Sequence, residues 1–423
     1  MPKKKRDAVP SPRRSAVGVV KRLRAEGHVA YLAGGCVRDE LLGIEPKDFD
    51  VVTDATPERV AELFDRTSLV GAAFGVVLVR HGRGRTTEVA TFRTDGEYRD
   101  KRRPDGVVFS TPEQDAQRRD FTVNALFLDP LEEDPAKRVI DFVGGRADLE
   151  KKLVRAVGDP EQRLAEDHLR ALRAVRFACR LDFALERRTG EAIEAYAAEL
   201  VGVSRERIGE ECRKMLGHRR APRAVNLIHR LGLDGPVLGV EPMGPIGLSV
   251  LRAVARHAAF VTSLAAWFLD RGVSVDSAEQ IDEAVRLARA GLCLSNKERD
   301  ALRGALETFR GMRLDWDVLA VAPRKRLMAR PGFEDGFRVL AATDFGVAAR
   351  LQDDFEALAR IGGGIRPTPF VTGDDLIEMG AEPGPGFQVW LDELYDRQLD
   401  GSITEKDAAM SRARELIGVS GVE

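Results

Sequence analysis

In this chain of 423 residues, a pair of glycines is followed by two carboxylates. Their types and spacing make them the first candidates for a catalytic or binding site. Asp48 and Asp50 stand two positions apart in a predicted strand, where alternate side chains point to the same face. Gly34 and Gly35 precede them, and glycine lets a backbone approach phosphate groups closely. Mg²⁺ is typically held by one or two carboxylates together with substrate phosphates. Each feature alone is common in solvated strand ends and turns, but together they predict a site that binds a divalent ion and a triphosphate.

Short elements are predicted around these residues and would position them. Thr56 and Pro57 are typical of an N-cap and a first helical position, and Gly27 is typical of the residue that ends a helix. Glu88 lies in the last of the predicted strands. The predicted elements are a helix at 14–26, a strand at 29–33, a helix at 35–42, and paired strands at 75–79 and 87–92.

Several strings resemble motifs of the class II tRNA nucleotidyltransferase and bacterial poly(A) polymerase family. The string GGCVRDELLG with KDFD (34–50) resembles motif A, RRDFTVNAL (118–126) motif B, and DFVGGRADL (141–149) motif C. The string EDHLRALR (166–173) contains the family's E-D-x-x-R-x-x-R pattern. The resemblance is strong over roughly the first 220 residues. Further on, VTGDDLIEMGAEPGPGF (371–387) resembles the C-terminal segment of bacterial tRNA nucleotidyltransferases.

The resemblance implies an α+β fold. An N-terminal nucleotidyltransferase head with a small mixed β-sheet would be followed by an all-helical neck, body and tail. We accordingly predict a disordered basic arm at 1–13, the head at 14–150, the neck at 151–218, and the body and tail at 219–423. In the helical part we expect breaks at Pro236, Pro242, Pro245, Pro323 and Pro331.

The resemblance also implies the roles of individual residues. Asp48 and Asp50 would hold two Mg²⁺ ions, and Glu88 would be the third catalytic carboxylate. The nucleotide would be bound by Gly34, Gly35, Arg38, Arg118, Arg119, Asn124, Asp167, Arg170, Arg173 and Arg176. The implied substrates are CTP, ATP and the acceptor end of a tRNA, which would receive its CCA end without a nucleic-acid template.

Residues 160–181 are predicted to form one amphipathic helix that carries the base-selecting residues. Its apolar positions form a stripe, and Asp167 and Arg170 fall on the opposite face, one turn apart. A salt-bridged surface helix has the same pattern. Cytosine and adenine both place an amine donor beside a ring-nitrogen acceptor. A carboxylate and a guanidinium complement that pair, and they would reject uracil and guanine.

Composition excludes several other kinds of protein. The formal net charge is −2, so RNA binding would require local basic patches. The four cysteines form no CxxC pair, which argues against a zinc site or a disulfide framework and fits a reducing cytoplasm. No apolar run approaches the roughly 18 residues of a membrane span.

Three alternatives to CCA addition stay open at this point. The first is a poly(A) polymerase; Ala72 and Ala73 stand where polymerases carry a basic pair, which counts against it. The second is a partial enzyme that adds only CC or only A. The polar segment 93–104, predicted to be a mobile loop, is partly missing in CC-adding enzymes. The third is a non-catalytic RNA-binding module, for which the carboxylate set would have no use.

Overall fold

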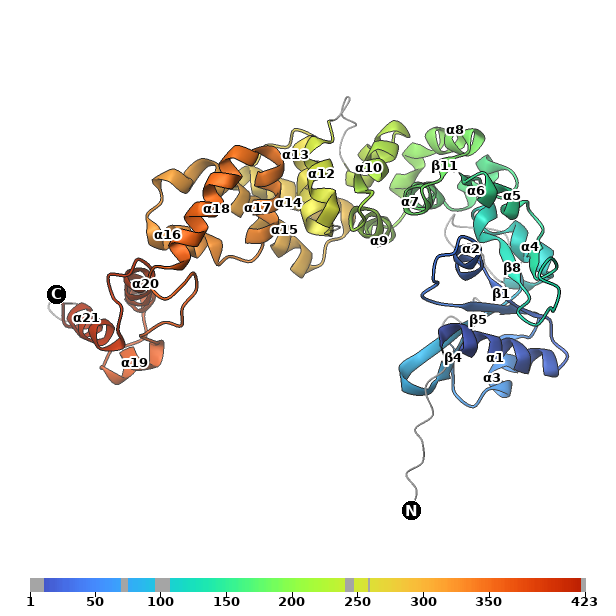
Figure 1. Cartoon of the computed structure of the whole chain (residues 1–423), viewed down its shortest axis with the longest axis horizontal. Helices are drawn as coiled ribbons and strands as arrows, with labels where there is room; N and C mark the ends of the chain where they lie inside the picture. The colour runs from blue at the N-terminus through green and yellow to red at the C-terminus, as the bar shows by residue number, and fades with distance from the viewer. Residues whose placement is uncertain (1–10, 70–74, 96–106, 240–246, 258, 420–423) are drawn as a thin grey trace, which may run out of the picture. The chain divides into compact units, whose positions relative to one another are not determined.

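The computed structural model describes residues 11–69, 75–95, 107–239, 247–257 and 259–419. The chain divides into two compact units. The first consists of Met1–Glu211 and Leu227–Val237, and the second of Cys212–Asn226 and Leu238–Glu423. All strands of the described residues belong to the first unit, and the second is helical (Figure 1). The predicted α+β class is confirmed.

A mixed seven-stranded sheet forms the centre of the first unit, in the order β3-β4-β5-β2-β1-β8-β9. Only β2 and β5 pair in parallel, and the other neighbours are antiparallel. The small mixed sheet expected for the head is therefore confirmed. Its strands are β1 (Ala30–Ala33), β2 (Asp50–Thr53), β3 (Thr67–Leu69), β4 (Val76–His81), β5 (Arg85–Thr91), β8 (Leu126–Leu128) and β9 (Val139–Asp141).

Helices cover both faces of this sheet. In Figure 1, α1 (Pro12–Ala25) and α3 (Pro57–Leu63) lie on one side of β4 and β5, and α2 (Gly35–Leu41) lies on the other. The predicted capping is confirmed: the Thr56 hydroxyl accepts from the Arg59 N–H at 3.3 Å, and Gly27 has φ +84°. Ser11 caps α1, which therefore begins two residues earlier than predicted. Residues 1–10 of the predicted disordered arm lie outside the described residues.

The segment after β5 differs from the prediction of one mobile loop at 93–104. Its first three residues form β6 (Arg93–Asp95), which pairs with β7 (Val107–Phe109). Residues 96–104 lie outside the described part of the chain. The head is completed by α4 (Pro112–Gln117), with a Thr111 capping box, and by α5 (Gly145–Glu150).

The predicted single helix at 160–181 is wrong. The structure has α6 (Pro160–Glu166) and α7 (Arg170–Leu181), separated by a short break. Asp167 ends α6 with an extended backbone, at φ −152° and ψ 102°. Its carboxylate accepts from the Leu169 N–H at 3.1 Å. Aspartate side chains compete in this way with helical hydrogen bonding, which explains the break inside an otherwise periodic sequence.

Short helices complete the first unit and lead into the second. A two-stranded parallel ladder, β10 (Leu153–Val154) with β11 (Ala184–Leu185), packs against α7. The helices that follow are α8 (Arg187–Ala195), α9 (Arg205–Leu216), α10 (Ala221–Arg230) and α11 (Asp234–Leu238).

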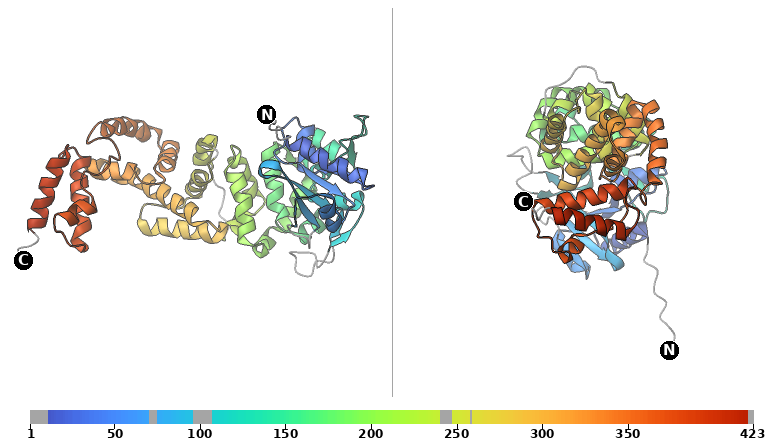
Figure 2. Two further views of the ribbon diagram at one scale, coloured as in Figure 1. Left: turned by 90° about the horizontal axis from the view of Figure 1, so that it is seen from below. Right: turned by 90° about the vertical axis from the view of Figure 1, so that its left-hand side faces the viewer.

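The second unit is built from packed helices. Figure 2 shows α20 and α21 side by side, where they share an apolar core with α19 that contains Leu376, Leu394 and Ala409. The helices are α12 (Ser249–Val254), α13 (Phe260–Asp270), α14 (Ala278–Leu292), α15 (Asn296–Arg310), α16 (Val321–Met328), α17 (Phe333–Thr343), α18 (Phe345–Ala359), α19 (Gly373–Glu378), α20 (Pro385–Leu399) and α21 (Lys406–Val419).

Two of the expected proline breaks are wrong. Pro236 and Pro323 are the third residues of α11 and α16, where the missing N–H would have had no helical partner in any case. Pro331 does separate α16 from α17 as predicted. Pro242 and Pro245 lie outside the described residues.

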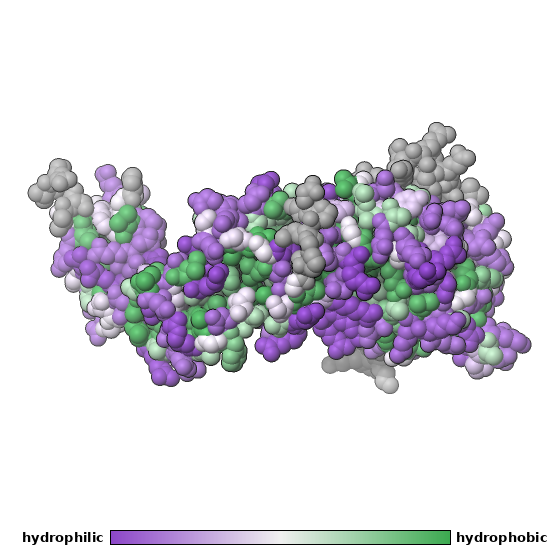
Figure 3. All heavy atoms as spheres, turned by 90° about the horizontal axis from the view of Figure 1, so that it is seen from above, coloured by the Kyte–Doolittle hydropathy of each residue, from purple (hydrophilic) through white to green (hydrophobic). Residues whose placement is uncertain are grey.

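The surface of the described residues offers no membrane-spanning element. None of their helices is both long enough and apolar enough to cross a bilayer. On the face shown in Figure 3, hydrophobic residues occur in small groups between hydrophilic ones.

Candidate active site

One pocket of about 530 Å³ in the first unit contains twelve of the thirteen predicted site residues. It is strongly polar, with eight arginines and four carboxylates in its lining. Residues from the sheet, from α2, from the segment after α4 and from α7 therefore meet at one place. The twelve are Gly34, Gly35, Arg38, Asp50, Glu88, Arg118, Arg119, Asn124, Asp167, Arg170, Arg173 and Arg176.

Asp50 and Glu88 stand beside each other on the wall formed by the sheet. Each comes one residue before the Val51–Val89 pair of the parallel strands β2 and β5, so both side chains point to the same face. The Asp50 side chain is accessible from the pocket, yet protein atoms surround most of it. This burial raises the pKa of its carboxyl to about 6; the charges of Glu88 and Asp48 add to the rise, and Arg119 opposes it.

Asp48 departs from the predicted arrangement. It precedes the strand, which begins at Asp50, and so the alternation of a strand does not apply to it. Its exposed side chain lines a neighbouring hollow of about 340 Å³ together with Lys47 and Thr87. It is nevertheless near enough to Asp50 to act on that carboxyl's pKa.

Gly34 is required by close packing at the pocket wall. Its φ is +72°, and an added Cβ would come within 2.9 Å of the Arg119 guanidinium. Arg119 in turn donates to the Asn124 carbonyl at 3.1 Å. The glycine therefore keeps the strand end and the motif B segment close together.

A buried carboxylate fixes the two arginines of motif B. Asp115, at the end of α4, pairs with Arg118 at 2.6 Å and with Arg119 at 3.0 Å. Burial alone would raise the pKa of Asp115, but the two guanidinium groups outweigh it and hold the pKa below its usual value. Because Asp115 sets the position of both cations, it is a positioning residue that the sequence did not identify.

Arg38 is held in the same manner from the other side of the pocket. Its guanidinium is buried, pairs with Asp39 at 2.6 Å, and donates to the Asn124 side chain. Asp39 also pairs with Arg180 of α7 at 3.1 Å. These contacts join α2, motif B and α7 around one cavity.

The break between α6 and α7 places Asp167 and Arg170 in the pocket, although not on one helix. The Arg170 guanidinium pairs with Glu166 at 2.6 Å and donates to the Arg163 carbonyl. The Asp167 carboxylate pairs with Arg207 of α9 at 2.7 Å. Both residues are therefore anchored to the helices that flank the break.

The next two arginines of α7 are fixed by carboxylates of other segments. Arg173 pairs with Asp120 of motif B and donates to it through Nε at 2.8 Å. Arg176 pairs with Glu211 of α9 at 2.8 Å. Each of these ion pairs connects α7 to a different part of the first unit.

Eight further residues line the pocket, and four of them have charged or aromatic side chains that were not among the predicted site residues: Arg93, Asp120, Phe177 and Arg180. Two of them had a usable signal. Asp120 is part of the motif B string, and Arg180 continues the three- to four-residue spacing of the α7 arginines. Arg93 had none, because its segment was interpreted as a loop.

The donor set of this pocket suits a divalent cation. Asp50 and Glu88 offer hard oxygen ligands, and the pKa of Asp50 is raised first by burial and then by the negative charge of Glu88, which a bound cation would offset. Within the described residues, no group of three metal-ligating side chains is clustered closely enough to form a complete site. The remaining ligands would have to come from Asp48 or from substrate phosphates.

Comparisons with known protein families match two parts of the chain. Residues 30–155 match the family described as "Poly A polymerase head domain". Residues 182–238 match "Probable RNA and SrmB- binding site of polymerase A".

Comparisons with curated proteins show similarity to CCA-adding enzymes. The chain is 42% identical to that of Geobacillus stearothermophilus over 230 residues, which is 54% of this chain and 55% of the relative. It is 43% identical to that of Bacillus pumilus over 227 residues, 53% of this chain and 55% of the relative. The alignments thus span about half the length of these relatives.

Solved structures resemble the chain over nearly its whole length. A crystal structure of the Bacillus stearothermophilus CCA-adding enzyme in complex with CTP superposes with a TM-score of 0.73 at 30% identity, covering 96% of this chain and 98% of that one. A Thermotoga maritima CCA-adding enzyme complexed with tRNA shares the fold, with a TM-score of 0.64 at 19% identity, covering 99% of this chain and 97% of that one.

Proposed function

The chain belongs to the class II tRNA nucleotidyltransferase and poly(A) polymerase family, and we propose that it adds C and A residues from CTP and ATP to the 3′ end of tRNA. The proposal rests on one observation: carboxylates of the sheet and arginines of motif B and α7 lie opposite each other in the same pocket. A reaction on a triphosphate requires mainly positioning and charge stabilisation, which such a pocket supplies.

Motif B and α2 would hold the triphosphate. Arg118 and Arg119 are fixed by Asp115, and Arg38 by Asp39, so their guanidinium groups are positioned before the substrate binds. The terminal hydroxyl of the RNA would attack the α-phosphate, and pyrophosphate would leave on the arginine side.

Asp50, Glu88 and Asp48 would hold the metal. Family members use divalent ions, and we assign two Mg²⁺ ions to these carboxylates. When bound, such ions lower the pKa of the attacking hydroxyl and neutralise charge on the leaving group.

Asp167 and Arg170 would read the pairing edge of the base. The carboxylate would accept from the exocyclic amine, and the guanidinium would donate to the ring nitrogen. Their anchors, Arg207 and Glu166, would hold both groups against the base without being replaced by it, because a carboxylate oxygen and a guanidinium each have further bonding positions.

The second candidate is a poly(A) polymerase of the same family, and the name of the matching head domain favours it. The T-G-x-D-L and P-G-P segment at 371–387 favours the tRNA enzyme. We place either activity in the cytoplasm, in keeping with four free cysteines.

Product length separates the candidates. Purified protein is incubated with labelled CTP and ATP and with tRNA that ends before, within or after CCA. The proposed enzyme should complete each end to CCA and stop. Long runs of A, whatever the starting end, would identify a poly(A) polymerase, while arrest after CC or addition of A alone would identify a partial enzyme.

A further inference from the structure

The face of the head sheet that carries the predicted catalytic carboxylates continues beyond the active-site pocket. Along β4, Val76 lines that pocket, and Leu78 and Arg80 follow on the same face because side chains alternate along a strand. On β5, Glu88 lies opposite Leu78, and Thr86 lies opposite Arg80. A hollow of about 500 Å³ opens over this extension, and it is lined by Arg66, Leu78, Arg80, His81, Gly84, Arg85 and Thr86.

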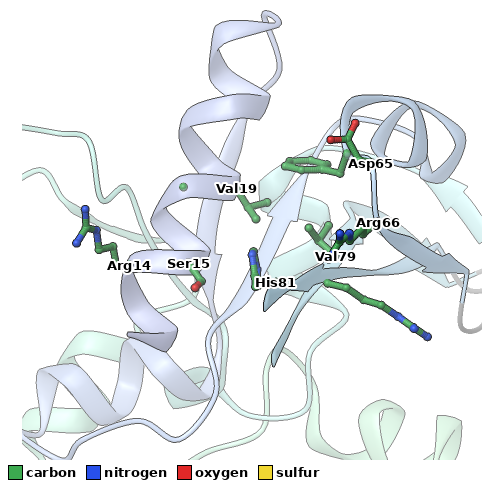
Figure 4. Close-up of a pocket in the computed structure, with 10 residues that line it drawn as sticks. Arg14, Ser15, Val19, Asp65, Arg66, Val79 and His81 are labelled. Atoms are coloured by element: carbon green, nitrogen blue, oxygen red, sulfur yellow. The ribbon is translucent and has the colours of Figure 1, made fainter. Parts of the chain in front are cut away.

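The other face of the same strands is covered by α1 and α3. Figure 4 shows Val79 of β4 and Val19 of α1 lining a separate hollow on that side. His81 belongs to this covered face by alternation, and so does Arg85, its partner in the register. The arginines that the register places on the active-site face are therefore Arg66 and Arg80.

Arg66 and Arg80 lie side by side on this extension. The Arg80 N–H donates to the Arg66 carbonyl at 2.8 Å, which continues the β3–β4 register by one pair and puts both side chains on one face. Like charges directly opposite each other destabilise a sheet. Both residues are exposed, and within the described part of the chain neither guanidinium forms an ion pair. Because the described residues that line the hollow include no carboxylate, an anion is needed to compensate the two charges.

The arginine pair lies between the carboxylates and the edge of the sheet. Glu88 and Arg80 are diagonal neighbours on adjacent strands, so their Cβ atoms are about 7 Å apart. Arg66 precedes β3, which is the edge strand on this side. The arginines predicted to bind the triphosphate lie on the other side of Asp50, where Gly34 follows β1. A second substrate could therefore reach the carboxylates from the β3 edge without displacing the nucleotide.

We propose that Arg66 and Arg80 bind phosphates of the single-stranded 3′ end of the RNA substrate. The terminal hydroxyl of that strand would lie at Asp50 and Glu88, and the preceding phosphates would follow the face of β4 towards β3. Guanidinium groups bind phosphate oxygens through charge-assisted hydrogen bonds, and such contacts do not depend on the base sequence. The inference rests on the proposed nucleotide addition, because it concerns the strand that would receive the nucleotide.

Binding of tRNA in the absence of nucleotide tests the proposal independently of nucleotide addition. The variant is Arg66→Gln/Arg80→Gln in the full-length chain, and the probe is a tRNA that ends in CC. The matched control, Arg22→Gln/Arg59→Gln, removes the same charge from α1 and α3, where both arginines pair with Glu26. The Kd for tRNA is measured at several salt concentrations, and the Kd for CTP is measured in parallel with Mg²⁺ present.

The salt dependence of tRNA binding reports directly on phosphate contacts. Each neutralised phosphate of a single strand contributes about 0.7 to the slope of log Kd against log salt concentration. The slope should therefore be lower by about 1.4 in Arg66→Gln/Arg80→Gln, and the tRNA Kd at low salt should be at least tenfold higher. The Kd for CTP should match that of wild type, and the control should keep all three wild-type values. These binding changes in a wild-type background that adds no nucleotide would contradict the proposed function and still support the RNA contact.

Three results would overturn the proposal. The first is a wild-type tRNA Kd and salt slope in the double variant. The second is a CTP Kd that rises as much as the tRNA Kd, because the arginines would then bind the triphosphate. The third is an equal effect on a tRNA that lacks its unpaired 3′ nucleotides, because the contact would then lie on the duplex.

A second variant decides the question if the first fails to fold. Thr86→Glu places a carboxylate opposite Arg80, where an opposite charge stabilises the sheet and competes with phosphate. Its tRNA Kd should rise at least threefold, with an unchanged Kd for CTP. A wild-type tRNA Kd in Thr86→Glu would rule the contact out.

Discussion

At the scale of single residues, the ionised carboxylate of Asp50, which nucleotide addition would require, should lower the stability of the folded protein. Its pKa of about 6 lies above the unfolded value near 3.8, so the folded state binds the proton more tightly and loses stability as pH rises through 6. Because the side chain is solvent accessible, we expect the cost at pH 8 to be about 1 kcal/mol, well below the full shift. Asp50→Asn should remove this cost and abolish nucleotide addition.

Urea unfolding at pH 5 and pH 8, without metal, checks this expectation. Asp50→Asn should be more stable than wild type at pH 8, and the difference should shrink at pH 5. Glu45→Gln, a change to an exposed carboxylate that does not line the pocket, serves as control. Equal stability of Asp50→Asn and wild type at pH 8 would contradict the argument.

Base selection should depend on the planar guanidinium of Arg170. Arg170→Lys keeps a positive charge that can still pair with Glu166, but it loses the fixed fork of donors. One lost charge-assisted hydrogen bond corresponds to about 1.5–3 kcal/mol, so the preference for CTP over UTP should fall at least tenfold. Measured kcat/KM values for the four nucleotides provide the test. Glu166→Gln removes the charge but keeps an oxygen that accepts from Arg170, so it should lower stability and change the ratio far less than Arg170→Lys does. A constant ratio in Arg170→Lys would mean that the base is read elsewhere.

Much of the site was predictable because its residues lie in short strings. Gly34, Arg38 and Asn124 could be named because motifs A and B keep them at fixed spacing. The prediction that Asp48 lies in a strand with Asp50 was wrong, because the strand begins only at Asp50. Asp115 was missed although its pairing with Arg118 and Arg119 has the i,i+3 and i,i+4 spacing of one helical turn, which the sequence does show.

At the scale of elements, glycines set how closely α15 and α17 pack. A Cβ on Gly336 of α17 would meet the Thr308 hydroxyl at 2.2 Å and the Ala305 carbonyl at 2.6 Å. Gly336→Ala should therefore force the helices apart and lower the free energy of unfolding by about 2–3 kcal/mol. Gly418→Ala in α21 is the matched control, because its Cβ meets nothing within 4 Å and alanine favours the helix. Chemical denaturation of both variants gives the comparison, and equal stability would refute the packing argument.

Periodicity and capping residues predicted the types of several elements, but they did not predict the break at Asp167 or the position of Pro323 inside a helix. The strands at 29–33, 75–79 and 87–92 and the Thr56 cap were predicted correctly, because alternation and cap residues are local signals. The break at Asp167 was not predicted, because the apolar stripe continues through it and the competing bond to Leu169 is invisible in a periodic pattern. Pro323 was overinterpreted because a proline in the first turn resembles a break in sequence alone.

At the scale of the whole molecule, the nucleotide pocket and the tryptophan residues lie in different units. All twelve predicted residues in the active-site pocket belong to the first unit. The three tryptophans, Trp267, Trp316 and Trp390, all belong to the second. Tryptophan fluorescence therefore follows the second unit, while far-ultraviolet circular dichroism follows both.

Because of this separation, we expect CTP to shift the thermal unfolding of the first unit and Gly336→Ala to shift that of the second. CTP at 100 times its Kd stabilises the unit that binds it by about 2.7 kcal/mol. Circular dichroism should therefore show one transition that moves to higher temperature with CTP, while the transition seen by tryptophan fluorescence stays in place. Gly336→Ala should do the reverse, because its packing defect lies wholly in the second unit. If CTP shifted the tryptophan transition as much as the other, the units would unfold as one cooperative body, and the assignment of nucleotide binding to the first unit alone would lose its support.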